Sequence, residues 1–258
     1  MSNQLQSKWQ IVSGGPPAHI TWLADGSGKR AVYKIARDRS EKKLIEPFNE
    51  LVCYRLTDTL GTATTAVYLE WAAGEPGIIS LVKSELNFGV VSSGTVTLSW
   101  ENQQFLNTLL VVDWWLANTD RPMGKPDHLI VIKNSESITL CPIDYSHALN
   151  GCSGEMYTLA TVSDPTKMPV SSYSHISEPY VKGFVDLEPA IAKIEHLDGA
   201  QIDHVVDDAV AEVSVGRSAD EVKFLVSNAE VVKALLRARQ ANLRPSLREW
   251  CVSKRKVA

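Results

Sequence analysis

The feature that most constrains this chain is a pair of aspartates, each placed at the end of a segment with rigid character. A helix is expected from Ser99 onward, and its residues 105–116, which are mostly apolar, run into the sequence Asn118-Thr119-Asp120-Arg121. Residues 129–141 then read as two short strands around a polar turn, and Asp144 follows the second strand. A helix that is apolar on nearly every side has to be buried. The pattern therefore predicts two carboxylates whose separation is fixed by a buried helix and a hairpin.

Capping signals predict where the main helices begin and end. Ser99 is suited to cap the long apolar segment at its N-terminus. A second helix is expected over residues 46–60, with Pro47 near its start and Gly61 ending it. The end of the chain is predicted to be all helical, in residues 187–197, residues 202–213 and a capping-box helix that runs from Ser218 to Leu243. The basic residues beyond it are expected to form a solvated tail, although docking to an acidic partner remains open.

The first 82 residues are predicted to form a small, mostly β unit. In residues 31–36, alternation of period two places Val32 and Lys34 on one face of a strand. Such a lysine either discourages edge-to-edge strand pairing or binds the phosphates of a nucleotide, with Val32 covering the base. Residues 77–83 read as another strand that leads into a hinge, where backbone groups at Ser80 and Val82 would bind adenine.

Glu50 lies beside the apolar stripe of the predicted helix 46–60. It either points toward the sheet and pairs with Lys34, or it is a solvated acid that favours the helix dipole. A strand lysine, a helix glutamate, a loop aspartate and a hairpin aspartate follow one another here in the order that phosphoryl-transfer sites of the kinase type require. The sequence thus favours a phosphotransferase.

Charge and composition exclude several other classes. The net charge of −4 leaves no strong basic field, so nucleic acid is not expected as a partner. No apolar run approaches the ~20 residues that span a bilayer, and no signal peptide is recognisable. Cys53 and Cys141 lie in apolar runs, where reduced and buried thiols are expected. We therefore expect a cytoplasmic protein without a membrane partner.

The chain resembles the HipA-like serine/threonine kinases in four motifs taken in order: Val32-Tyr33-Lys34, residues 49–56, Asn118-Thr119-Asp120-Arg121 and Ile143-Asp144. The resemblance implies an α+β, two-lobed protein-kinase-like fold, with a small β-rich N-lobe in residues 1–82 and a larger, mainly helical C-lobe in residues 83–258. It also implies Mg²⁺-dependent transfer of the γ-phosphoryl group of ATP to a Ser or Thr hydroxyl of a protein, the chain itself included.

The same resemblance assigns roles to single residues. Asp120 becomes the catalytic carboxylate and Asp144 the Mg²⁺ ligand. Lys34 contacts the phosphates and Glu50 forms the ion pair with Lys34. The segment Ser13-Gly14-Gly15 is the counterpart of a glycine-rich loop in which such kinases phosphorylate themselves, and a phosphate there would oppose ATP binding.

The sequence departs from the family pattern at the second metal position. Lys125 stands where an asparagine is expected, Asp127 occupies the next asparagine position, and Ile-Asp-Tyr replaces Ile-Asp-His. An ammonium cannot ligate Mg²⁺, whereas a carboxylate can. Either Asp127 takes the second metal contact or the protein is a nucleotide-binding pseudokinase with a regulatory role. A third reading, a non-enzymatic α+β binding protein whose aspartates cap loops, also remains open.

Overall fold

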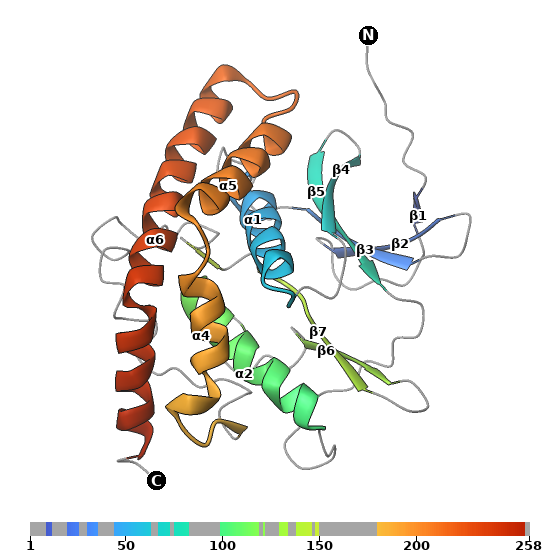
Figure 1. The fold of residues 1–258 in the computed structure, drawn as a ribbon. Helices are drawn as coiled ribbons and strands as arrows, with labels where there is room; N and C mark the ends of the chain where they lie inside the picture. Colours follow the sequence, from blue (N-terminus) through green and yellow to red (C-terminus); the bar gives the residue numbers. More distant parts are fainter. Residues whose placement is uncertain are drawn as a thin grey trace.

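The computed structural model arranges the chain as a sheet beside a body of helices (Figure 1). It describes residues 9–11, 20–25, 30–35, 44–62, 67–72, 75–82, 99–118, 121, 129–133, 138–145, 148–149 and 180–255. Most strand residues are described by their backbone, and side chains are described mainly in the helices and the segments that adjoin them.

The N-terminal strands form one antiparallel sheet with the order β1-β2-β3-β5-β4. Its strands are β1 (Trp9–Ile11), β2 (Ile20–Asp25), β3 (Arg30–Ile35), β4 (Val67–Ala72) and β5 (Glu75–Val82). The register of β3 and β5 sets Val32 opposite Ser80 and Lys34 opposite Ile78. A separate antiparallel pair is formed by β6 (Leu129–Lys133) and β7 (Ile138–Pro142). Asp144 follows β7, as the sequence places it.

Apart from the C-terminal end of α6, the helices begin and end close to the predicted positions. They are α1 (Ile45–Thr59), α2 (Trp100–Trp115), α4 (Glu188–Glu195), α5 (Gly199–Val213) and α6 (Ala219–Arg255), with the short 3-10 helix η4 (Phe184–Asp186) before α4. The predicted cap of α2 is confirmed, because the Ser99 hydroxyl accepts a hydrogen bond from the Asn102 amide. Gly61 ends α1 with a φ of +71°, a backbone angle that costs a glycine little.

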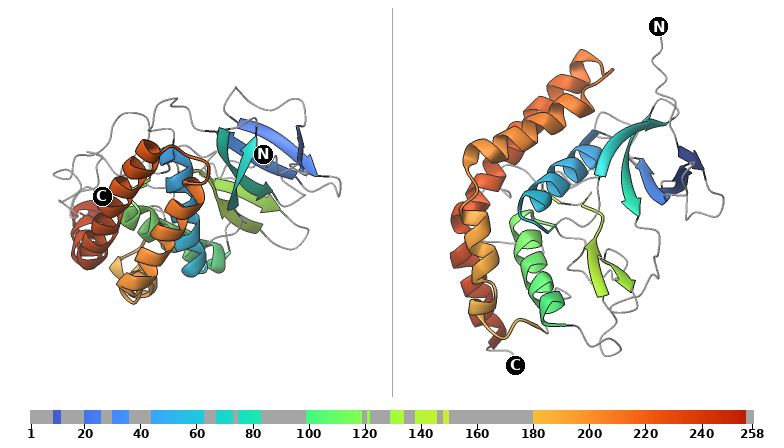
Figure 2. Two further views of the ribbon diagram at one scale, coloured as in Figure 1. Left: turned by 90° about the horizontal axis from the view of Figure 1, so that it is seen from above. Right: turned by 45° about the vertical axis from the view of Figure 1, so that its right-hand side comes forward.

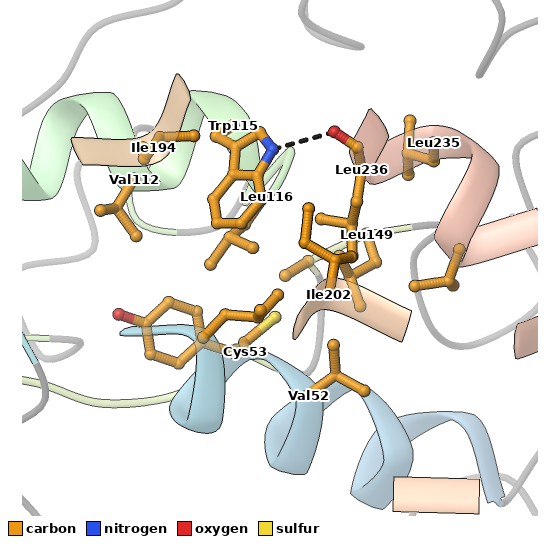
Figure 3. Close-up of a cluster of buried hydrophobic side chains, with 14 of the residues drawn as sticks. Val52, Cys53, Val112, Trp115, Leu116, Leu149, Ile194, Ile202, Leu235 and Leu236 are labelled. Carbon is orange, nitrogen blue, oxygen red and sulfur yellow. Dashed lines mark hydrogen bonds between the residues drawn. The ribbon is translucent and has the colours of Figure 1, made fainter. Parts of the chain in front are cut away.

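The main buried cluster joins residues from α1, α2, α4, α5 and α6. At its centre lies Trp115, whose indole nitrogen donates to the carbonyl of Leu236 over 3.0 Å, while Cys53 and Val52 of α1 close the cluster from the other side (Figure 3). α1 packs against α5 and also borders β4 and β5, so it lies between the helices and the sheet (Figure 2). Leu129 and Leu140 form a smaller cluster with Leu106 and Leu109, which seats the β6–β7 pair on α2.

The predicted fold class is wrong for this described core. It was an α+β, two-lobed, protein-kinase-like fold with a small β-rich N-lobe and a larger, mainly helical C-lobe. The part described with its side chains is mainly helical, and α1, expected within the N-lobe, contributes to the same buried cluster as α2, α4, α5 and α6. Hydrophobic periodicity reports which face of a segment is buried but not what covers it, so it could not assign α1 to one lobe.

The C-terminal helix is longer than predicted. α6 has 37 residues and continues through Pro245, where the sequence suggested an end near Leu243. A proline removes one helical hydrogen bond, but burial of Trp250 and Cys251 beyond it holds the last turns on the core. Arg244 forms ion pairs with Glu188 and Glu195 of α4. Residues 244–254 therefore form a helix that packs on the core along one face, and Arg248 is exposed on it, as expected of a solvated basic segment.

Candidate functional site

Asp144 adopts a backbone conformation that is uncommon for a residue with a side chain. Its φ is +62°, in the left-handed region, and its side chain is half-buried. Outside glycine, that region is visited mainly by Asn and Asp, and each such residue costs free energy that the surroundings have to offset. Conformations of this kind concentrate at functional sites. The surroundings of Asp144 therefore decide what it can do.

Arg121 anchors the segment that precedes Asp144. Its guanidinium is fully buried, Nε donates to Oδ2 of Asp113 over 2.7 Å, and Nη1 donates to the carbonyl of Ile143 over 3.1 Å. The other carboxylate oxygen of Asp113 accepts from Nδ2 of Asn118 over 3.0 Å. Burial alone would lower the pKa of Arg121, but the charge and hydrogen bond of Asp113, together with the nearby Tyr145 and Tyr54, outweigh burial and raise it. The guanidinium stays charged and ties the loop after α2 to the segment after β7.

Tyr145 follows Asp144 and is fixed from α1. Its backbone amide donates to Oε2 of Glu50 over 2.9 Å. Its ring meets the ring of Tyr54 edge to face at 5.1 Å, and Cζ of Arg121 lies 4.8 Å from its centre. Burial raises the pKa of the Tyr145 hydroxyl, so this group stays neutral. Arg121 and Glu50 thus meet at one residue, although they come from different parts of the chain.

The turn after Tyr145 is held by both α1 and α2. Nδ2 of Asn49, the neighbour of Glu50, donates to the carbonyl of Ala148 over 3.0 Å. The amide of Leu149 donates to the carbonyl of Leu116, just past the end of α2, over 2.6 Å. Both Asn49 and Glu50 are buried. Two consecutive polar side chains of α1, Asn49 and Glu50, therefore form hydrogen bonds with the backbone just after Asp144.

α6 fixes the C-terminal end of α2 through hydrogen bonds. Arg239 is buried and donates to the carbonyls of Trp114 and Trp115 in the last turn of α2, where helix carbonyls have fewer backbone donors available than in the middle of a helix. The indole nitrogen of Trp114 donates to Oγ of Ser246 over 3.1 Å. A cation at a helix C-terminus is also favourable toward the helix dipole. The C-terminus of α2, from which the loop at Asn118 starts, is thus held in place by α6.

The structure places only some of the predicted site residues. Glu50 is buried and hydrogen-bonded, so its reading as a solvated acid is wrong. Val32, Lys34, Ser80 and Val82 lie on the adjacent strands β3 and β5, and their side chains are outside the described ones. Six further predicted positions lie outside the described residues: Ser13, Gly14, Gly15, Asp120, Lys125 and Asp127. The Lys34–Glu50 pair and the catalytic and metal roles stay predictions.

Four residues of this network were not assigned a role from the sequence: Asn49, Asp113, Arg121 and Tyr145. A signal existed for Asp113, because a carboxylate inside an otherwise apolar, buried helix needs a cationic or hydrogen-bonding partner. Within the described residues, no group of three or more His, Cys, Asp or Glu side chains is placed to hold a metal ion. No helix in the described part of the chain is long and apolar enough to cross a membrane.

The chain is similar in fold to a solved kinase structure. The chain is similar to the proinflammatory kinase CtkA of Helicobacter pylori, with a TM-score of 0.59 and 13% identity over 95% of this chain and 96% of that one. HipA of the Shewanella oneidensis toxin–antitoxin system, solved with HipB and operator DNA, matches at 10% identity over 93% of this chain and 67% of that one, with a TM-score of 0.45. No protein-family model and no curated protein sequence matches the chain.

Proposed function

We propose that this chain is an ATP-dependent kinase that transfers a phosphoryl group to a Ser or Thr hydroxyl of a protein. The observation that carries the proposal is the link through Arg121. This residue follows Asp120 directly in the sequence, and it binds both Asp113 and the carbonyl of Ile143, next to Asp144. One buried side chain therefore connects the loop of the first predicted carboxylate with the segment of the second. The kinase-like fold shared with CtkA supports the same reading.

Each proposed role draws on chemistry that phosphoryl transfer needs. Asp120 would accept a hydrogen bond from the attacking hydroxyl and orient it. Lys34 would neutralise phosphate charge, held by Glu50, while Val32 and the backbone at Ser80 and Val82 would surround the base. The glycine-rich segment Ser13-Gly14-Gly15 would cover the phosphates, and Ser13 is the proposed site of self-phosphorylation.

The residues at hand suit Mg²⁺ as the metal. Mg²⁺ prefers hard oxygen ligands, commonly one or two carboxylates together with phosphate oxygens. Asp144 supplies a half-buried carboxylate, whereas the carboxylates of Asp113 and Glu50 are buried in the core. We propose that Asp144 and Asp127 hold the ion, which would offset charge on the transferring phosphoryl group when bound.

Transfer is tested with radiolabelled ATP, Mg²⁺ and either dephosphorylated casein or the chain alone. Asp120→Asn and Asp144→Asn should each lower incorporation by at least about 100-fold, the range of a general base or a metal site. Asp58→Asn is the matched control, because Asp58 is an exposed aspartate on α1. Loss of signal in the control, or equal signal in all variants, would contradict the proposal.

One observation favours a second candidate, a pseudokinase that binds nucleotide without turnover. Lys125 occupies a position where the resemblance expects a metal-binding asparagine. A pseudokinase would show Mg²⁺-dependent stabilisation of the wild type by ATP in thermal unfolding, and Lys34→Ala would abolish it. The same wild-type protein would incorporate no label into itself or into casein.

A further inference from the structure

The two peptide groups that flank Asp144 are held by different parts of the molecule. The carbonyl of Ile143 belongs to the preceding peptide group and accepts from Nη1 of Arg121. The amide of Tyr145 belongs to the following peptide group and donates to Oε2 of Glu50. The backbone angles φ and ψ of Asp144 are the only soft rotations between these two planes. Fixing both planes therefore fixes the conformation of Asp144.

We infer that Glu50 and Arg121 are positioning residues that together hold Asp144 in its left-handed conformation. We call this pair of contacts the Asp144 clamp. Both contacts are charge-assisted, since a carboxylate accepts one hydrogen bond and a guanidinium donates the other, and such bonds are stronger than neutral ones. They offset the free energy that a left-handed aspartate costs. The inference deepens the proposed function and rests on it only for the role of Asp144 as a metal ligand.

The clamp makes Asp144 sensitive to the position of α1. Glu50 and Asn49 belong to one helix, and they contact the amide of Tyr145 and the carbonyl of Ala148 respectively. Arg121 is instead bound to α2 through Asp113, and α2 is fastened to α6 through Arg239. A movement of α1 relative to α2 would therefore displace the peptide group after Asp144, while the peptide group before it stays bound to Arg121. This differs from a role for Glu50 limited to the lysine of β3, because here the glutamate acts on the backbone beside the metal ligand.

The test separates the acceptor function of Glu50 from its charge. Glu50→Met keeps the length of the side chain and removes the acceptor, and Glu50→Ala is the second variant in case the longer side chain prevents folding. Glu50→Gln keeps an acceptor oxygen without the charge. Asp58→Ala removes an exposed carboxylate from the same helix and serves as the control.

Amide hydrogen exchange at Tyr145, measured at residue resolution, is the readout that needs no activity. Glu50→Met or Glu50→Ala should speed exchange at this amide by about tenfold or more, while Glu50→Gln and Asp58→Ala stay within about threefold of the wild type. Exchange in α6 should not change. Exchange at Tyr145 that stays within about threefold of the wild type in both Glu50→Met and Glu50→Ala would overturn the clamp.

The kinetic arm asks whether the clamp serves the metal site. In Glu50→Met, the Mg²⁺ concentration for half-maximal transfer should rise on the order of tenfold relative to Glu50→Gln, more than the KM for ATP does. An unchanged Mg²⁺ requirement would overturn the link to the metal. If the wild type transfers no phosphoryl group, the proposed function fails, and the exchange measurement still decides whether the clamp exists.

Discussion

Arg121 and Asp113 form an ion pair in which neither side chain reaches solvent, with Nε and Oδ2 2.7 Å apart. Removing two charges from water costs more than their attraction returns unless further hydrogen bonds satisfy the remaining atoms. Here Asn118 binds the second carboxylate oxygen and the carbonyl of Ile143 accepts from the guanidinium. Apart from any contribution to stability, the pair therefore connects the loop after α2 with the segment that contains Asp144.

Arg121→Ala should be strongly destabilising because it leaves Asp113 charged and buried without its partner. We expect a loss of about 3–5 kcal/mol in the free energy of unfolding, measured by urea titration. The double variant Asp113→Leu/Arg121→Met removes both charges and fills the space, so it should recover much of that loss. It would still lack the hydrogen bond to Ile143, and transfer should stay impaired in it. Equal destabilisation by the single and double changes would contradict this account.

Tyr145→Phe should leave the fold intact and stabilise it slightly. The Tyr145 hydroxyl is buried and has no hydrogen-bond partner among the residues that the structure describes, and its removal leaves the ring contacts with Tyr54 and Arg121 in place. A buried unsatisfied polar group costs about 1–3 kcal/mol. The free energy of unfolding of Tyr145→Phe, measured by thermal unfolding, should therefore be higher than that of the wild type by up to about 1 kcal/mol. Tyr145→Ala, which removes the ring, should instead lose about 3–5 kcal/mol. A large loss in Tyr145→Phe would show that the hydroxyl has a partner after all.

The sequence predicted elements better than it predicted the contacts between them. Ser99 and Gly61 mark ends of α2 and α1 because capping is local, and a few neighbouring residues determine it. The contact from Glu50 to the amide of Tyr145 spans 95 positions and ends on a backbone group, which carries no sequence signature. The length of α6 also depends on contacts that are distant in sequence. The helix continues past Pro245 because Trp250 is buried, and this tertiary packing outweighs the local helix-breaking tendency of proline.

Stability should fall at alkaline pH because two buried acids resist ionisation in the folded state. Burial, together with the charges of Glu50 and Asp113, raises the pKa of the Cys53 thiol, and burial likewise raises the pKa of the Tyr145 hydroxyl. The unfolded chain loses these protons first, above about pH 8.5 for cysteine and about pH 10 for tyrosine. Their ionisation then favours the unfolded state, by up to about 1.4 kcal/mol per pH unit for each group.

Chemical denaturation between about pH 7 and pH 11 measures this effect. Cys53→Ala should flatten the pH dependence from about pH 8.5 upward, and Tyr145→Phe should flatten it only above about pH 10. At pH 7 both groups are neutral in either state, so neither contributes to the slope there. A slope that both variants leave unchanged would assign the alkaline loss to other groups.

Arg239→Ala should loosen the end of α2 from α6. The buried guanidinium donates to the carbonyls of Trp114 and Trp115, and hydrogen bonds from a charged group contribute about 1.5–3 kcal/mol. We expect a loss of about 2–3 kcal/mol in urea unfolding and faster amide exchange near Leu116 and Asn118. Arg237→Ala, which removes an ion pair with Asp203 at the surface, is the control and should cost less than about 1 kcal/mol. A control as damaging as Arg239→Ala would argue against the capping role.

The last prediction concerns the departure from the kinase pattern at Lys125. If Asp127 supplies the second metal contact, Asp127→Ala should raise the Mg²⁺ requirement and lower transfer strongly, because a carboxylate oxygen is lost from a site that needs oxygen ligands. Lys125→Asn should be tolerated or mildly activating, since it restores the residue type that the pattern expects. An ammonium beside the triphosphate would offset charge but would not bridge two phosphate oxygens with octahedral geometry. The opposite result, a silent Asp127→Ala and an inactive Lys125→Ala, would reverse the assignment and make Lys125 the group that offsets phosphate charge. Transfer is measured against Mg²⁺ concentration at saturating ATP, so that a metal defect is distinguished from a nucleotide defect.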